Sequence, residues 1–156
     1  MKLYSWNVNG IRAVWNKGLF QQFIAEHDPD ILCLQETKLQ IDQISEDEAS
    51  IDGYDSVWNS AERKGYSGVA TFFNKQPIEI ETGIGIEKFD NEGRVIRLKF
   101  EDFFLYNIYF PNGGEGNKRV PFKLEFYEEL LKICDDLHDQ GEKLIITGDF
   151  NTAHNE

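Results

Sequence analysis

The opening residues of the chain predict two strands with a helix between them, which restricts the fold to one that contains parallel strands. Residues 2–8 alternate and are rich in aromatic and branched side chains, which favours a strand. Residues 18–27 carry apolar side chains at helical spacing, and Pro29 ends this helix because the residue before a proline avoids the α region. Residues 31–35 form a continuous apolar run, as in a strand buried on both faces. The pattern predicts a right-handed β-α-β unit with parallel strands.

Further strands and one more long helix are predicted along the rest of the chain. The helix covers residues 119–140, where apolar side chains recur every three or four residues, and Gly141 is a fitting stop. Strand patterns occur at about 54–58, 68–74, 94–100, 103–110 and 143–147. Two helices can cover only one face of a sheet, so this prediction leaves the apolar side chains of the other face uncovered.

The balance of charges argues against a protein that binds a polyanion through its bulk charge. The 156 residues include 16 Lys and Arg against 28 Asp and Glu, and the formal net charge is -12. Contact with nucleic acid therefore needs a local basic surface or bound cations. Basic residues do gather near the predicted loops and form a candidate cationic rim: Arg12, Lys17, Lys38, Arg63, Lys64, Lys118 and Arg119.

Composition excludes several classes of protein. The 12 Phe, 6 Tyr and 3 Trp are too much apolar surface for a disordered chain. No apolar run approaches the roughly 20 residues of a membrane span, and the N-terminus lacks the apolar core of a signal peptide. Cys33 and Cys134 lie in apolar runs, which favours small buried side chains over a disulfide or a zinc site. We expect one cytoplasmic domain without membrane contact.

Oxygen-bearing side chains follow three apolar runs at the points where predicted strands end. Asn7 and Asn9 follow the first run, Glu36 the second, and Asp149 and Asn151 the last. Ligands of open α/β sheets bind outside the carboxyl ends of the strands, so neighbouring strands would bring these side chains to one place. Carboxylate and amide oxygens without Cys or His favour a hard cation, Mg²⁺ or Mn²⁺.

Each cluster also has a plainer explanation as a turn, because Gly-Asp and Asn-Gly pairs are common in turns. Three clusters together favour a site. Tyr109 ends another strand pattern and is either a core tyrosine or a hydroxyl at the same edge. Tyr66 lies in a tight loop between glycines, where it either caps a core or contacts nucleic acid. His154 follows the last cluster, but a single loop histidine is weak support for a site.

Six stretches, taken together, resemble the exonuclease III family of apurinic/apyrimidinic (AP) endonucleases, within the endonuclease/exonuclease/phosphatase superfamily. They are WNVNGIRA at 6–13, PDILCLQETK at 29–38, GYSGVA at 65–70, EGRVI at 92–96, YFPNG at 109–113 and GDFNTAH at 148–154. They occur in the family's order and spacing over essentially the whole chain. The last stretch alone is typical of the superfamily, whereas the second, third and fourth together are much more specific to its DNA-repair branch.

The resemblance implies an α/β fold of the deoxyribonuclease I-like type, a four-layer αββα (α+β) sandwich of two packed sheets. The family's domain continues well past the length of this chain. Residues 1–156 are therefore expected to be the N-terminal part of a single domain whose C-terminal part is absent. We expect this part to supply about one sheet with its helix layer, in agreement with the uncovered sheet face predicted above.

The resemblance also implies roles for individual residues. Glu36 resembles the principal metal ligand, with Asn7, Asp149 and Asn151 in the same metal network. Tyr109 resembles the active-site tyrosine near the scissile phosphate. Asp149 resembles the residue that orients or deprotonates the attacking water, and Asn151 resembles a donor to a phosphate oxygen.

Further positions resemble residues that contact DNA or support the site. The positions expected to contact DNA are Arg12, Lys38, Tyr66 and Asn112. Asn9 and His154 are expected to support the site.

Three functions remain open on the sequence. The first is a Mg²⁺-dependent (or Mn²⁺-dependent) DNA-repair nuclease that cuts duplex DNA 5′ to abasic sites and trims 3′ ends. The second is a superfamily phosphomonoesterase. The third is a non-catalytic half-domain that self-associates, with a homodimer through the uncovered sheet face. On its own, this chain is expected to be inactive or very weakly active, because residues that act as a catalytic unit would be missing.

Overall fold

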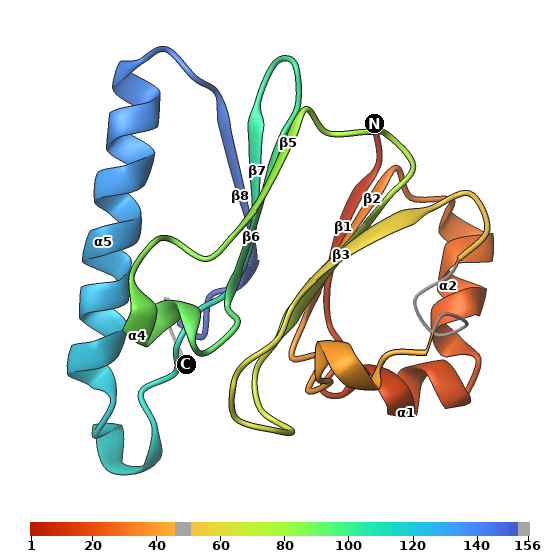
Figure 1. The fold of residues 1–156 in the computed structure, drawn as a ribbon, viewed down its shortest axis with the longest axis horizontal. Helices are drawn as coiled ribbons and strands as arrows, with labels where there is room; N and C mark the ends of the chain where they lie inside the picture. The colour runs from red at the N-terminus through yellow and green to blue at the C-terminus, as the bar shows by residue number, and fades with distance from the viewer. Residues whose placement is uncertain (46–50, 153–156) are drawn as a thin grey trace.

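A computed structural model describes residues 1–45 and 51–152, and in this part of the chain the strands form two sheets of four strands each (Figure 1). The first sheet has the order β1-β2-β4-β3 and the second the order β5-β6-β7-β8. The strands of the first sheet are β1 (Leu3–Asn7), β2 (Ile31–Gln35), β3 (Asp55–Asn59) and β4 (Val69–Phe73). Those of the second are β5 (Glu79–Thr82), β6 (Val95–Lys99), β7 (Phe104–Tyr109) and β8 (Leu144–Asp149).

The predicted β-α-β unit is confirmed. Strands β1 and β2 pair in parallel, and helices α1 (Ile11–Asn16) and α2 (Leu19–His27) lie between them in the chain. Asp28 has a φ of 45° and ends α2 in the left-handed region, directly before Pro29. All residues of β2 are buried, as its continuous apolar run indicated. Helix α1 was not predicted.

The remaining helices lie against the second sheet. Helix α5 (Val120–Asp139) confirms the long helix predicted for this region, and α4 (Glu87–Asp90) is a single turn. Two short 3₁₀ turns cover Ile41–Gln43 and Glu115–Asn117. The strand patterns at 94–100 and 103–110 are confirmed as β6 and β7, which pair as an antiparallel hairpin, and β8 then adds to β7 in parallel. No helix of the described residues is both long and apolar enough to cross a bilayer.

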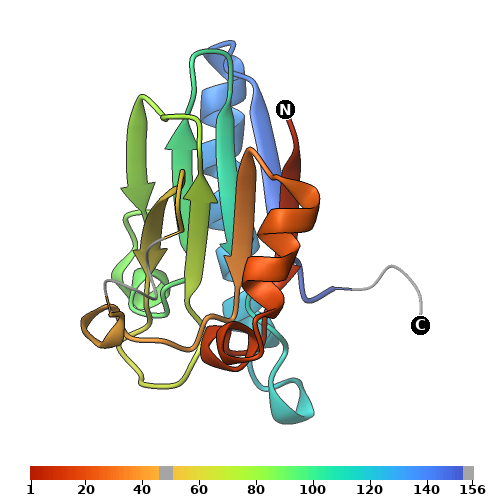
Figure 2. The same cartoon turned by 90° about the vertical axis from the view of Figure 1, so that its right-hand side faces the viewer.

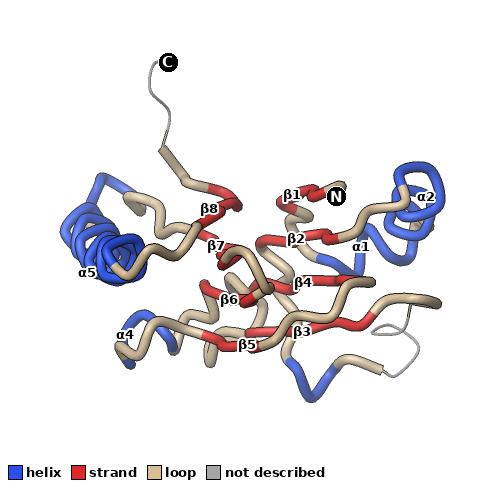
Figure 3. The backbone as a smooth tube through the Cα atoms, turned by 90° about the horizontal axis from the view of Figure 1, so that it is seen from above, coloured by secondary structure: helices blue, strands red, loops and turns tan. Residues whose placement is uncertain are grey.

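The molecule has four layers, with helices outside two sheets that pack face to face (Figures 2 and 3). Helices α1 and α2 cover the outer face of the first sheet around Phe20 and Phe72. Helix α5 covers the outer face of the second sheet around Tyr106 and Phe126. A third apolar cluster lies between the sheets and joins side chains of both: Ile31, Cys33, Val69, Phe73, Ile96, Leu98, Leu105 and Tyr109.

The α/β sandwich is therefore confirmed, but the expectation that this chain supplies about one sheet with its helix layer is wrong. The chain contributes four strands and a helix layer to each of the two sheets. The strand patterns identified strands without identifying their partners, and β5 begins a new sheet instead of extending the first. The predicted uncovered face is covered by the other sheet, which removes the surface on which the predicted homodimer was based.

A polar contact crosses the core between the two sheets. Gln35 and Asn107 are each 1% exposed, and Gln35 Nε2 donates to Asn107 Oδ1 at 2.8 Å. Asn107 Nδ2 in turn donates to the carbonyl oxygen of Ala70 at 2.9 Å and to the hydroxyl of Thr71 at 3.0 Å. Buried amides are costly unless they are hydrogen-bonded, so this bridge favours one relative position of the sheets.

We expect the substitution Asn107→Leu to lower the free energy of unfolding by about 1–3 kcal/mol, because it removes the shortest hydrogen bond of the Gln35 amide and leaves the Ala70 carbonyl without the Asn107 donor in the core. Urea unfolding followed by circular dichroism measures this change. Asn16→Leu makes the same substitution at an exposed residue and serves as the control. Equal unfolding midpoints for the two variants would show that the bridge does not contribute to stability.

Candidate active site

Four strand ends meet at one end of the sandwich and carry the predicted site residues (Figure 2). Asn7, Tyr109 and Asp149 are the last residues of β1, β7 and β8, and Glu36 follows β2 directly. Side chains alternate between the two faces of a strand. Asn7 lies on the face of the first sheet that looks toward the second sheet, and Tyr109 and Asp149 lie on the face of the second sheet that looks toward the first. The expected convergence of strand ends is confirmed, but it involves two sheets instead of one.

Two hydrogen bonds join the sheets at this site. The Tyr109 hydroxyl donates to Glu36 Oε1 at 2.8 Å, and Asn7 Nδ2 donates to Asp149 Oδ2 at 2.7 Å. The second carboxylate oxygen of Asp149 accepts the backbone N–H of Asn151 at 3.0 Å. The carboxylates of Glu36 and Asp149 are therefore each fixed by a partner from the other sheet or from the following loop.

Residues of this site adopt left-handed backbone conformations that side chains other than glycine rarely adopt. The φ angles are 53° at Glu36, 56° at Lys38, 51° at Ser67, 45° at Asn9 and 49° at Asn151. Such conformations cost free energy and persist where the surrounding structure enforces them.

Hydrogen bonds between neighbouring loops supply this enforcement. The backbone N–H of Gly10 donates to the carbonyl of Glu36 at 2.7 Å, and that of Lys38 donates to the carbonyl of Ser67 at 2.9 Å. The loop after β2 is thus tied to both neighbouring loops, which holds the Glu36 carboxylate in place before any ligand binds.

The protonation of Tyr109 follows from its surroundings. Burial of its phenol, together with the hydrogen bond to the Glu36 carboxylate, raises the pKa of Tyr109 well above the usual value of a tyrosine. Asn151 and the charge of Arg94 act in the opposite direction but do not compensate. At neutral pH Tyr109 is therefore a hydrogen-bond donor and not a base.

The donor set of the site fits a magnesium ion. The described residues contain no group of three or more His, Cys, Asp or Glu side chains placed to hold a metal. They do offer the carboxylates of Glu36 and Asp149 beside the amides of Asn7 and Asn151. Mg²⁺ is commonly held by one or two carboxylates and keeps several waters, so this sparse set of oxygens suits it.

The residues predicted to contact DNA lie at the same end of the molecule, three of them in loops and Arg12 on a helix. Lys38 Nζ donates to Asn9 Oδ1 at 2.5 Å and lies 3.8 Å from Glu36 Oε1. Arg12 is on α1 and donates to the carbonyl of Gln43 at 3.0 Å. Asn112 is exposed in the loop after β7. His154, predicted to support the site, lies outside the described residues.

Tyr66 stands in a cluster of three arginines, of which Arg63 and Arg119 belong to the predicted cationic rim and Arg94 does not. Its hydroxyl accepts hydrogen bonds from Arg94 Nη2 at 2.9 Å and from Arg119 Nη1 at 2.6 Å. The Arg63 guanidinium carbon lies 5.2 Å from the centre of its ring. The predicted cationic rim thus gains a buried member, Arg94, and a carboxylate, Glu92, that binds both Arg94 and Arg119. The sequence feature that could have indicated Arg94 as a site residue was an arginine at the start of the apolar strand pattern at 94–100.

Comparison with known proteins agrees with this geometry. The sequence pattern of the Endonuclease/Exonuclease/phosphatase family matches residues 4–156. An exodeoxyribonuclease of Bacillus subtilis is 45% identical over 156 residues, and the chain covers 60% of its length. The DNA repair nuclease APEX1 of Danio rerio is 39% identical over 158 residues, and the chain covers 50% of its length. The chain thus spans about half of these relatives.

Solved structures also have this fold. The catalytic domain of APE2 from Xenopus laevis superposes with a TM-score of 0.84 at 33% identity, covering 99% of this chain and 60% of that structure. An AP endonuclease from Archaeoglobus fulgidus superposes with a TM-score of 0.81 at 29% identity, covering 98% of this chain and 57% of that structure. Both structures therefore share the fold of this chain.

We expect Tyr109 to remain protonated where ordinary tyrosines titrate, at about pH 10. The raised pKa means that the folded state holds the phenol proton more tightly than the unfolded state. The resulting stabilisation is complete below about pH 10 and is lost as the pH rises above it. When phenolate absorbance is followed in the folded protein, the same number of tyrosines should therefore ionise near pH 10 in the unsubstituted chain and in Tyr109→Phe.

The same titration in denaturant is the control, because there all 6 tyrosines are free and the variant must lose one. One phenolate fewer in the native variant near pH 10 would show that Tyr109 titrates normally.

Proposed function

Because this chain belongs to the endonuclease/exonuclease/phosphatase family, we propose that it carries phosphodiester-cleaving residues of a DNA-repair nuclease. The proposed reaction is Mg²⁺-dependent hydrolysis of duplex DNA 5′ to abasic sites, with trimming of 3′ ends. The main support is the meeting of Tyr109 with Glu36 and of Asn7 with Asp149 at one end of the sandwich. Exodeoxyribonuclease, AP endonuclease and DNA repair nuclease are the names of the similar proteins.

Glu36 is the residue proposed to hold the metal, with Asn7 beside it. Mg²⁺, when bound, supplies positive charge to the phosphate oxygens and the leaving group. Tyr109 donates to Glu36 Oε1, which fixes that carboxylate and leaves its other oxygen for a ligand. The hydrogen bond also keeps a phenol, and not a phenolate, next to the place proposed for the phosphate.

Asp149 is proposed to orient the attacking water and to accept its proton. Both of its oxygens already accept hydrogen bonds, from Asn7 and from the backbone of Asn151, so its orientation is set before substrate arrives. Asn151 Nδ2 donates to the carbonyl of Phe110 at 2.7 Å. This bond uses one N–H of the Asn151 amide, and the second N–H is proposed to donate to a phosphate oxygen.

Recognition of DNA is proposed for the loops around these residues. Lys38 and Asn112 follow β2 and β7, Tyr66 precedes β4, and Arg12 lies on α1 after β1. Their position gives a chain of net charge -12 a local surface suited to a phosphate backbone. The acidic net charge of the chain does not prevent DNA binding if that binding depends on this local surface and on the metal.

A DNA 3′-phosphatase is the second candidate, and one comparison favours it. The chain superposes on a structure described as the 3′ phosphatase NExo from Neisseria, bound to a product DNA hairpin, with a TM-score of 0.83 at 28% identity. The same carboxylates serve the hydrolysis of a phosphomonoester at a 3′ end. Release of inorganic phosphate from a 3′-phosphorylated duplex, without nicking at an abasic site, would favour this candidate.

Two further expectations stay predictions: that residues 1–156 are the N-terminal part of one domain, and that the protein is cytoplasmic. Self-association of the chain also remains an alternative, but through sheet edges instead of a sheet face. Strands β1 and β8 each end a sheet and lie beside one another across the sandwich (Figure 3). The outer backbone of an edge strand is a template for pairing with another chain.

If the edges of β1 and β8 pair with a second copy, light scattering at micromolar concentration should give twice the monomer mass. A mass of 18.1 kDa would contradict self-association.

The nuclease proposal predicts that this chain nicks a labelled duplex with one abasic-site analogue in the presence of MgCl₂, at a rate far below that of a complete enzyme. Asp149→Asn should abolish the nicking, because the substituted amide cannot accept a proton from water. Glu36→Gln should weaken Mg²⁺ binding, measured by calorimetry, by about tenfold or more.

The substitutions also control for contaminating nuclease. Nicking that survives Asp149→Asn does not come from this site. The proposal fails if the unsubstituted chain gives neither nicking nor a Mg²⁺-binding heat that Glu36→Gln reduces.

A further inference from the structure

Arg94 is a buried cation to which the proposed reaction gives no task. It directly precedes β6 and is 2% exposed. Arginine keeps its charge at any physiological pH and carries five N–H donors, so it is rarely buried without several partners. Its side chain lies on the face of the second sheet that looks toward the first sheet, since the next inward-facing residues of β6 are Ile96 and Leu98.

The guanidinium of Arg94 binds three partners in three directions. Nε donates to Glu92 Oε2 at 2.6 Å, Nη1 to the carbonyl oxygen of Tyr109 at 2.9 Å, and Nη2 to the hydroxyl of Tyr66 at 2.9 Å. Its guanidinium carbon also lies over the rings of both tyrosines, 5.0 Å from the ring centre of Tyr109 and 5.7 Å from that of Tyr66. A rigid planar fork can satisfy these directions at once, whereas the single ammonium group of a lysine cannot.

Tyr109 is therefore held by Arg94 at several points. Besides the carbonyl and the ring, its backbone N–H donates to the carbonyl of Arg94 at 2.9 Å. The far end of the same side chain donates to Glu36. Arg94 thus holds the backbone and ring of Tyr109. The hydroxyl of Tyr109 in turn holds the carboxylate of Glu36, which is proposed to bind the metal.

Tyr66 is held from the other side by a closed ring of hydrogen bonds. Arg119 donates to the Tyr66 hydroxyl through Nη1 at 2.6 Å and to Glu92 Oε1 through Nη2 at 2.6 Å. Glu92 binds both arginines, one with each carboxylate oxygen. The lone pairs of the Tyr66 hydroxyl are thus occupied by two cationic donors, so its own proton is free to be donated to an incoming acceptor.

We propose that Arg94 is a positioning residue that couples the Tyr66 loop to the Tyr109–Glu36 pair. A phosphate oxygen that accepts a hydrogen bond from the Tyr66 hydroxyl is thereby connected to the guanidinium that orients Tyr109. Binding of the DNA strand at the Tyr66 loop is then coupled, through Arg94, to the orientation of the Glu36 carboxylate. The identity of the acceptor as DNA rests on the proposed function, whereas the connection between the two tyrosines does not.

The experiment uses the chain labelled with 3-fluorotyrosine and followed by ¹⁹F NMR without DNA. Its 6 tyrosine signals are assigned through single Tyr→Phe variants. Arg94→Lys keeps the charge but loses the fork, and it should shift the signals of both Tyr66 and Tyr109. A purely structural role would lower stability without changing the ligand site of the folded protein. We therefore also expect Arg94→Lys to weaken Mg²⁺ binding in calorimetry by several-fold.

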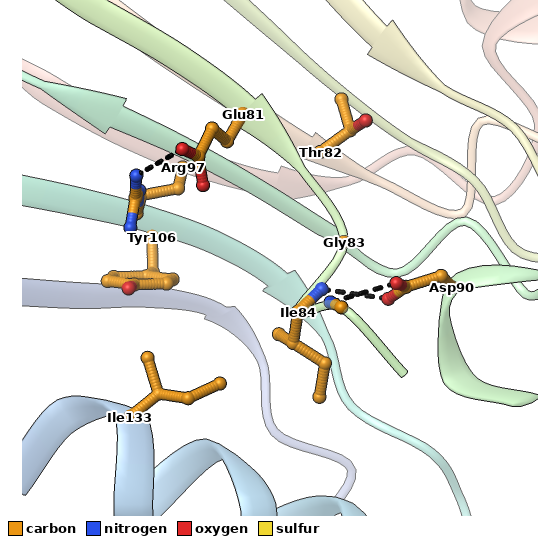
Figure 4. Close-up of a pocket in the computed structure, with 9 residues that line it drawn as sticks. Glu81, Thr82, Gly83, Ile84, Asp90, Arg97, Tyr106 and Ile133 are labelled. Atoms are coloured by element: carbon orange, nitrogen blue, oxygen red, sulfur yellow. Dashed lines mark hydrogen bonds and ion pairs between the residues drawn. The ribbon is translucent and has the colours of Figure 1, made fainter. Parts of the chain in front are cut away.

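Arg97→Lys is the matched control. Arg97 lies on the opposite face of β6, where its guanidinium binds Glu81 at 2.7 Å beside the ring of Tyr106 (Figure 4). The same substitution there should move the Tyr106 signal and leave the Tyr109 signal and the Mg²⁺ affinity unchanged.

Tyr66→Phe tests the coupling even if Arg94→Lys does not fold. It keeps the half-buried ring and removes only the hydroxyl that Arg94 and Arg119 share. The Tyr109 signal should shift although Tyr109 itself is unchanged, and affinity for a duplex oligonucleotide should fall about tenfold.

An unmoved Tyr109 signal in Tyr66→Phe overturns the coupling. Unchanged Mg²⁺ affinity in a folded Arg94→Lys variant overturns the positioning role. Failure of the proposed function is distinguishable, because nicking can be lacking in the unsubstituted chain while the ¹⁹F signals still respond together.

Discussion

The buried hydrogen bond between Gln35 and Asn107 sets the relative position of the two sheets, and the site depends on that position. The apolar cluster between the sheets has no directional preference, since hydrophobic contact is roughly proportional to area. The amide pair does have one, because each member must find its partner inside the core. Glu36 follows Gln35 in the chain, and Tyr109 lies two residues beyond Asn107 on the same face of β7. Fixing the amide pair therefore also brings the carboxylate to the phenol.

The site is built from groups that are already oriented by the protein. Glu36 and Asp149 accept hydrogen bonds from the opposite sheet, and the strained loop after β2 is tied to its neighbours through the backbone. Arg94 extends this rigidity to the Tyr66 loop. Pre-oriented groups need little rearrangement as charge develops on a substrate, which is the usual basis of catalysis by fixed dipoles and charges. A sparse set of carboxylate and amide oxygens is what a hydrated Mg²⁺ ion accepts.

The sequence predicted most strands and both long helices, because each depends on a local pattern. The buried run before Glu36 and the helical spacing before Pro29 are confirmed as β2 and α2. The partition of strands into two sheets was predicted incorrectly. Periodicity reports which face of a strand is apolar, but not which element covers it. For the same reason the sequence indicated Tyr66 and Arg119 as separate positions and gave no reason to join them through Arg94.

By itself the sequence determined the β-α-β start, the strand ends that carry Asn7, Glu36 and Asp149, and the resemblance to a nuclease family. These are properties of contiguous residues, so they survive without knowledge of the fold. The tertiary structure decided that Asn7 meets Asp149 across 142 residues of chain and that Tyr109 meets Glu36 across 73. In this fold both contacts arise because the two sheets pack face to face, and packing and buried hydrogen bonds, not local propensity, select the partner.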